Sequence, residues 1–186
     1  MPRLPDFREK YPDIEIEFIT SVRLVDLTRE EADLGIRYGF GEYEGLVSSQ
    51  LVKGTLMPVC SPAVVQASDG NLTTLLSTAR RIQTAGYNEW RDWSRLANID
   101  ISATQPAYVI EDFLVAIKAI TMGQGLALLP HILVQDQLAS GELVQFCDTP
   151  LEIEHTFHLA HTTASVRRPF VQTVVEWLRT SLAHLN

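Results

Sequence analysis

At residues 111–141 the sequence reads EDFLVAIKAITMGQGLALLPHILVQDQLASG, in which two helix-like stretches flank a short apolar run. Glu111 and Asp112 fall in the first turn of the first helix, where the helix dipole favours negative charge, and Gly123 is its expected end. The run GLALLP predicts a buried strand, and a second helix is expected over 131–140. This order of helix, strand and helix is typical of an α/β protein.

The rest of the chain shows the same alternation. Strands are expected at 14–21, 33–38, 81–86, 107–110, 143–146 and 155–163, and helices at 4–11, 24–31, 72–79 and 170–182. In IEIEFITS (14–21), apolar Ile14, Ile16 and Phe18 alternate with glutamates, as in a strand near a sheet edge. Strands that alternate with helices imply an α/β fold with mostly parallel sheets.

The composition is that of an ordinary globular protein. With 186 residues, 46% of them hydrophobic and 20% charged, the chain can form one large domain or two small lobes. The formal net charge of −8 argues against a nucleic-acid-binding surface, since phosphate binding relies on clustered Lys and Arg. The charged opening does not resemble a signal peptide and no apolar run approaches the ~20 residues that span a bilayer, so a cytoplasmic location is expected. Cys60 and Cys147 indicate neither a disulfide framework nor a CxxC metal site.

Patterns for catalysis or metal binding are not found. GQGLA (123–127) contains Gly-x-Gly, but it follows a helix and precedes a strand, the reverse of a dinucleotide-binding fingerprint, so helix capping is favoured. His155, His158 and His161 are spaced by three, but in a strand His158 points away from the other two, which disfavours a joint zinc site. The chain is therefore expected not to be an enzyme, and no cofactor or metal is expected.

Four segments follow one another in a recognisable order: PRLPDFREKYPDIEIEF, EADLGIRYGFGEYEGLVSSQLVKGTLMPVCSP, DFLVAIKAITMGQGLALLPHILVQDQLASGELVQ and VQTVVEWL. Together they resemble the effector-binding domain of LysR-type transcriptional regulators, nearest to the glycine-cleavage-activator-like subgroup. The resemblance implies a two-lobed type 2 periplasmic-binding-protein-like fold, joined by two crossover strands, with a small effector between the lobes. Lobe I would comprise residues 1–60 and 160–186, and lobe II residues 61–159.

The resemblance also implies partners. A domain of this kind senses a small-molecule effector and pairs with itself as a homodimer or tetramer, here through the helix with Leu4 and Phe7 and the strand with Ile16. DNA binding would depend on the family's N-terminal winged helix-turn-helix, which lies outside these residues. A free-standing small-solute-binding protein of the same fold is the alternative, although such a protein normally carries an export signal.

The family's domain begins with a strand that precedes the helix at PRLPDF, and this sequence starts after that strand. Lobe I is therefore expected to be missing its first, central strand. Without it, IEIEFITS and DLGIRYG are expected to be left with unpaired backbone groups or forced together directly.

DLGIRYG (33–39) raises the question of what an arginine does at the end of an apolar run. The residues alone leave two interpretations: Arg37 pairs with Asp33 or another carboxylate at a sheet edge, or Arg37 and the backbone near Gly39 hold a ligand. The resemblance favours the second, because ligands bind beyond the carboxyl ends of strands in open α/β sheets. A helix begins at Asp112, where backbone N–H groups suit an anionic effector, with capping by Asp112 the alternative. The full set of effector-binding candidates is Thr20, Ser21, Arg37, Tyr38, Gly39, Ser61, Thr84, Asp112 and Phe113.

Overall fold

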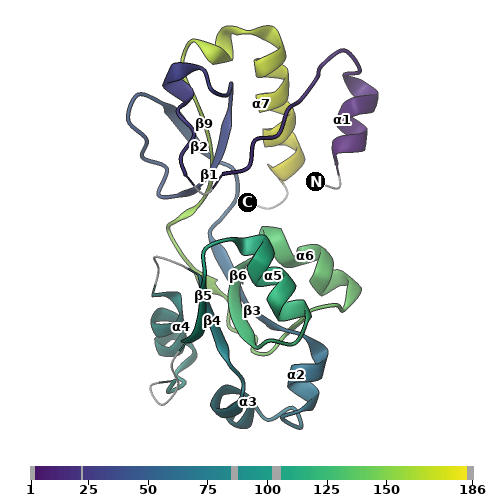
Figure 1. Cartoon of the computed structure of the whole chain (residues 1–186), viewed down its shortest axis with the longest axis vertical. Coiled ribbons are helices and arrows are strands. Elements are labelled where there is room, and N and C mark those ends of the chain that lie inside the picture. Colours follow the sequence, from purple (N-terminus) through teal and green to yellow (C-terminus); the bar gives the residue numbers. More distant parts are fainter. Residues whose placement is uncertain (1–2, 22, 85–87, 102–105, 184–186) are drawn as a thin grey trace. The chain divides into compact units, whose positions relative to one another are not determined.

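The computed structural model describes residues 3–21, 23–84, 88–101 and 106–183. It divides into two compact units: unit 1 comprises Met1–Gly54 and Glu154–Asn186, and unit 2 comprises Thr55–Ile153 (Figure 1). The lobe boundaries expected after residues 60 and 159 each lie slightly further along the chain than these divisions. The difference arises because the strand that begins at Thr55 is hydrogen-bonded within unit 2.

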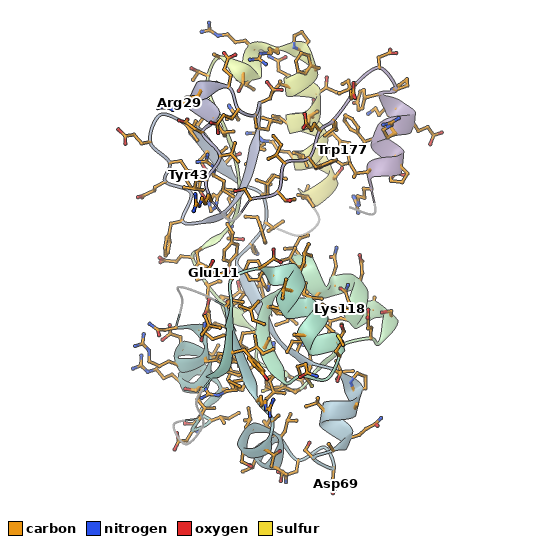
Figure 2. All side chains as sticks on the ribbon, in the orientation of Figure 1. Arg29, Tyr43, Asp69, Glu111, Lys118 and Trp177 are labelled. Atoms are coloured by element: carbon orange, nitrogen blue, oxygen red, sulfur yellow. The ribbon has the colours of Figure 1, made fainter. Side chains whose placement is uncertain are left out.

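Two helices of unit 1 pack against each other through aromatic rings. α1 (Leu4–Lys10) has a proline in its first turn and ends before Pro12, as its pattern predicts. Phe7 is fully buried, and its ring centroid lies 4.9 Å from that of Trp177 in α7 (Pro169–Leu182) (Figure 2). Phe7 thus belongs to the core of its own unit, whereas the other residues of α1 are partly or fully exposed.

The sheet of unit 1 has three strands in the part of the chain that the structure describes. Their order is β1-β9-β2, with bounds Gly35–Gly39, Thr156–His161 and Val47–Gln50 respectively. Both pairs are antiparallel, and Arg37 and Gln50 each lie opposite His158 of the central strand. The expectation of mostly parallel strands is therefore wrong for this unit, because β9 runs against both of its neighbours.

Residues 14–20 form no strand, contrary to their alternating pattern. Within the described residues, Ile14 N donates to the carbonyl oxygen of Tyr11 at 3.2 Å, and β1 pairs with β9 alone. Phe18 and Ile19 are 54% and 53% exposed. An alternating pattern makes a segment suitable for a strand, but a strand also requires a hydrogen-bonded neighbour.

The helix expected over 24–31 is reduced to one turn of 3-10 helix, η1 (Leu27–Arg29). Asp26 caps this turn, since its Oδ1 accepts hydrogen bonds from the Thr28 backbone N at 2.9 Å and from the Thr28 hydroxyl at 2.6 Å. The hydroxyl hydrogen bond holds the pKa of Asp26 below its ordinary value. The capping side chain thus marks where this short turn begins.

The larger sheet lies in unit 2 and mixes parallel and antiparallel pairs. In chain order, its described strands are β3 (Thr55–Cys60), β4 (Arg81–Thr84), β5 (Pro106–Ile110), β6 (Leu126–Pro130), β7 (Val144–Gln145) and β8 (Leu151–Glu152). In space, they lie in the order β5-β4-β6-β3-β7, and β8 also pairs with β3. β4 is parallel to β5 and β6, as expected, whereas β3 is antiparallel to β6, β7 and β8. The carboxyl end of β3 therefore lies at the opposite edge of the sheet from those of β4 and β5.

The helices of unit 2 supply two apolar clusters. They are α2 (Pro62–Gln66), α3 (Leu72–Thr78), α4 (Glu89–Ala97), α5 (Phe113–Thr121) and α6 (His131–Ser140) (Figure 1). Trp90 and Trp93 of α4 belong to one cluster, with ring centroids 5.7 Å apart. Ile117 and Ile120 of α5 belong to the other. α6 ends at Gly141 in the left-handed conformation, as the sequence predicts.

Candidate functional site

Arg37, in the middle of β1, is held by residues of its own unit. Its Nη2 donates to the carbonyl oxygen of Val25 at 2.7 Å, and its Cζ lies 4.8 Å from the ring centroid of Tyr43 (Figure 2). Asp33 pairs instead with Arg168, and no ion pair of Arg37 occurs among the described residues. The edge ion pair considered for Arg37 is therefore wrong. The arginine links the segment before β1 to the loop after it.

His158 of β9 lies opposite Arg37 and is closely covered by the loop that follows β1. Gly41 in that loop has a φ of +85°, and a Cβ at this position would lie 2.6 Å from two atoms of the His158 ring. A Cβ at Gly39 would lie 3.1 Å from the Tyr43 hydroxyl. The spacing of His155, His158 and His161 draws attention to His158 only as a metal ligand, and no local pattern singles out Tyr43; the neighbours of both residues depend on strand pairing between distant parts of the chain.

Tyr38 lies on the other face of the sheet from Arg37, since adjacent residues of a strand alternate. Its ring centroid is 5.2 Å from that of His155 and 4.9 Å from that of Phe157 on β9. The structure therefore separates Arg37 and Tyr38 across the sheet, although both belong to the strand end at which a ligand is expected.

Thr20 and Ser21 follow an unpaired extended segment and not the end of a strand. Both are exposed. The Ser21 hydroxyl donates to the carbonyl oxygen of Arg23 at 2.8 Å, and Ser21 Oγ accepts from Arg23 N at 3.0 Å. These bonds form a local turn. No described contact joins either residue to Arg37.

In unit 2, Thr84 and Asp112 lie at the same edge of the sheet. Thr84 ends β4 and pairs in register with Ile110, the last residue of the parallel strand β5. Asp112 follows two positions after Ile110 and caps α5, with its Oδ1 accepting from Leu114 N at 2.8 Å and from Val115 N at 3.1 Å. Phe113 begins the same helix. The capping interpretation of Asp112 is therefore correct, and its carboxylate occupies N–H groups that an anionic ligand would use.

Ser61 lies at the opposite edge of that sheet, so the structure does not bring it together with Thr84. Cys60, which precedes it, pairs with Leu126, and Leu126 also pairs with Arg81 at the start of β4. Thr84 is at the other end of β4. Mostly parallel sheets were expected, whereas β3 runs antiparallel to its neighbours, so its carboxyl end lies away from that of β4.

The described residues show no group of three or more His, Cys, Asp or Glu side chains that could hold a metal ion. Both cysteines are free, and burial raises the pKa of the Cys60 thiol to about 11. A thiol with this pKa stays protonated at neutral pH, so Cys60 is a poor nucleophile. No described helix combines the length and apolar character needed to cross a bilayer.

Comparison with known proteins gives consistent results. A profile of the family described as the LysR substrate binding domain matches residues 1–183. The HTH-type transcriptional activator AmpR of Rhodobacter capsulatus is 29% identical over 184 residues, which cover 96% of this chain and 60% of the relative. The glycine cleavage system transcriptional activator of Escherichia coli strain K12 is 24% identical over 180 residues, covering 96% of this chain and 59% of the relative.

A solved structure also matches nearly the whole chain. The effector domain of the transcriptional regulator AmpR of Pseudomonas aeruginosa has a TM-score of 0.84 and 25% sequence identity, with 98% of this chain and 88% of that chain covered. The chain thus has the two-lobed fold of such effector domains. It spans about 60% of the length of the curated relatives reported above. Those relatives are transcription activators, not enzymes.

Proposed function

This chain belongs to the family of LysR substrate-binding domains, and we propose on that premise that it senses a small-molecule effector for a DNA-binding transcriptional regulator. The match of the family profile to residues 1–183 is the observation that carries the proposal. DNA binding would belong to a winged helix-turn-helix outside these residues. The net charge of −8 supports this division, because the chain offers few clustered cations for phosphate.

Each unit supplies its own proposed effector contacts. In unit 1, Arg37 has guanidinium N–H groups besides the one that Val25 accepts, and these suit an anionic effector such as a carboxylate. In unit 2, the buried residue Thr84 brings a hydroxyl to the carboxyl end of a parallel strand, where α/β proteins bind ligands. The other proposed contacts are Thr20, Ser21, Tyr38, Gly39, Phe113 and the backbone beside Asp112.

Two other classes of function are less well supported. A free-standing small-solute-binding protein would share the fold, but the relatives reported above are transcription activators. The same relatives argue against an enzyme. In addition, the candidate groups are engaged in structural contacts: Asp112 caps a helix, and Arg37 binds a backbone carbonyl.

We propose that the regulator works in the cytoplasm as a homodimer. Each unit leaves large apolar side chains exposed, which is consistent with surfaces that a second subunit covers. In unit 2 these include Val109 at the edge strand β5 and Leu114 on α5, and in unit 1 they include Phe18. The buried Phe7 is not among them.

A chimeric regulator tests the proposed function. The chain is joined to the DNA-binding part of the Escherichia coli glycine cleavage activator, and transcription from that activator's promoter is measured while the supply of small metabolites is varied. We expect transcription to respond to at least one metabolite. Thr84→Val should weaken the response, because it removes a hydroxyl and keeps the shape, whereas Thr73→Val on the exposed side of α3 should not. A chimera that occupies the promoter but gives constant transcription in every condition would contradict the proposal.

A further inference from the structure

Arg81, the first residue of β4, is a buried arginine that has no counter-charge among the described residues. Only 4% of the residue is exposed, and its Nε is buried with no hydrogen-bond partner. Within the described residues, its side chain forms neither an ion pair nor a hydrogen bond. Its one described side-chain interaction is with Trp90, whose ring centroid lies 5.5 Å from the Arg81 Cζ.

The surroundings of Arg81 are apolar on its face of the sheet. Arg81 pairs with Leu126, which pairs in turn with Cys60, and both of these belong to the buried cluster that contains Trp90. Burial lowers the pKa of the Arg81 guanidinium from its ordinary value. A buried cation is costly unless it is paired, and a single aromatic ring compensates it only in part.

The obvious internal partner is occupied elsewhere. Glu89, a buried carboxylate one residue before Trp90, accepts a hydrogen bond from Gln83 Nε2 at 2.6 Å. The backbone beside Arg81 is fixed, because Leu126 N donates to the carbonyl oxygen of Arg80 at 2.8 Å. Among the described residues the Arg81 guanidinium is thus held in place without a hydrogen-bonded partner, and only the Trp90 ring compensates part of the cost of its burial. Such local violations are expected at functional sites.

We propose that Arg81 is an anion-binding group, whose guanidinium, lying over the Trp90 ring, takes a small oxyanion at the amino-terminal end of β4. The planar guanidinium presents paired N–H donors that match a carboxylate, sulfate or phosphate. This site is separate from the proposed effector contacts, since Arg81 begins β4 whereas Thr84 ends it. The oxyanion would be either an inorganic ion or the carboxylate of a metabolite.

Thermal unfolding of the 186-residue chain in different sodium salts tests this site. Chloride, sulfate and acetate are compared at equal ionic strength for the wild type, Arg81→Met and Arg80→Met. Sulfate stabilises proteins in general, so the measured quantity is the salt response of the wild type minus that of Arg81→Met. Arg80 is the matched control, because it is the neighbouring arginine and its exposed side chain donates to the Tyr108 hydroxyl.

At an anion concentration about tenfold above the dissociation constant, the anion should raise the melting temperatures of the wild type and of Arg80→Met by about 3–6 °C more than that of Arg81→Met. If this difference in melting temperature occurs in sulfate alone, the natural ligand is an inorganic oxyanion. If it occurs in acetate, the ligand carries a carboxylate. Equal responses of the wild type and Arg81→Met would overturn the proposal. If Arg81→Met does not fold, Arg81→Lys takes its place; it keeps the charge but loses the paired donors, so a full response in that variant would also overturn it.

Discussion

The guanidinium of Arg37 lies over the ring of Tyr43, with 4.8 Å between the Arg37 Cζ and the ring centroid. The same side chain donates to the carbonyl oxygen of Val25. One arginine therefore joins the segment before β1, the strand itself and the loop after it. A substitution at this position affects the stability of unit 1 as well as any ligand contact, and the two effects have to be measured separately.

Arg37→Met should lower the free energy of unfolding of unit 1 by about 1.5–3 kcal/mol, the usual worth of a hydrogen bond from a charged group. The methionine retains much of the side-chain length but neither the Val25 hydrogen bond nor the charge over Tyr43. Arg29→Met is the control, because the Arg29 side chain is 81% exposed and an exposed ion pair such as the one it forms with Asp26 contributes little to stability. Urea unfolding, monitored by circular dichroism, measures the free energy of unfolding of both variants and of the wild type. Equal losses in the two variants would show that the contacts of Arg37 do not stabilise the unit.

Gly41→Ala should be more destabilising than Gly70→Ala. Both glycines have positive φ, so each alanine incurs a backbone cost of about 1–2 kcal/mol. A Cβ at Gly41 would also collide with the buried His158 ring, whereas a Cβ at Gly70 meets nothing within 4 Å. The collision should add about 1–3 kcal/mol. Thermal melts compare the two variants, and similar midpoints would mean that the loop after β1 does not lie against His158.

Asp112→Ala should destabilise unit 2 by about 0.5–2 kcal/mol, because it removes the cap of α5 and leaves the N–H groups of Leu114 and Val115 without their acceptor. Asp112→Asn should retain most of the stability, since asparagine caps helices about as well. Chemical unfolding distinguishes the two variants. A larger loss for asparagine than for alanine would show that the charge of Asp112, and not its capping hydrogen bonds, is what matters.

Ile36→Lys should slow aggregation of the isolated chain. Ile36 is 55% exposed on β1, which has a single described partner strand, and a lysine on an edge strand discourages pairing with other chains. Leu96→Lys is the control, since Leu96 is 56% exposed but lies on a helix. Light scattering during prolonged incubation reports the rates. If both variants aggregate more slowly by the same factor, the effect is due to lower surface hydrophobicity and not to the edge strand.

The elements that the sequence predicts well are those with local signals. α6 follows its apolar pattern and ends at Gly141, and the run Leu126–Pro130 is a fully buried strand. Asn71 caps α3 by accepting a hydrogen bond from Thr74 N. Each of these features depends on residues that lie within a few positions of one another, so the sequence pattern contains the information that is needed.

The features that the sequence does not predict depend on distant parts of the chain. Strand direction is one, since an apolar run reads the same in both directions, and for this reason the antiparallel course of β3, which separates Ser61 from Thr84, was not expected. The partner of Arg37 is another, because the carbonyl oxygen of Val25 is a backbone atom that any residue could supply. The contact of Gly41 with His158 likewise exists only once β1 and β9 have paired.

Equilibrium dialysis of the chain against a bacterial metabolite extract, followed by mass spectrometry, is the most direct test of effector sensing. We expect the native chain to retain a small molecule at about one per chain and to release it chemically unchanged. Thr84→Val should retain less of this molecule than the wild type, whereas Thr73→Val should retain as much. Effector sensing would be contradicted if the native chain retained no more than the heat-denatured chain, or if the retained molecule were converted into a product.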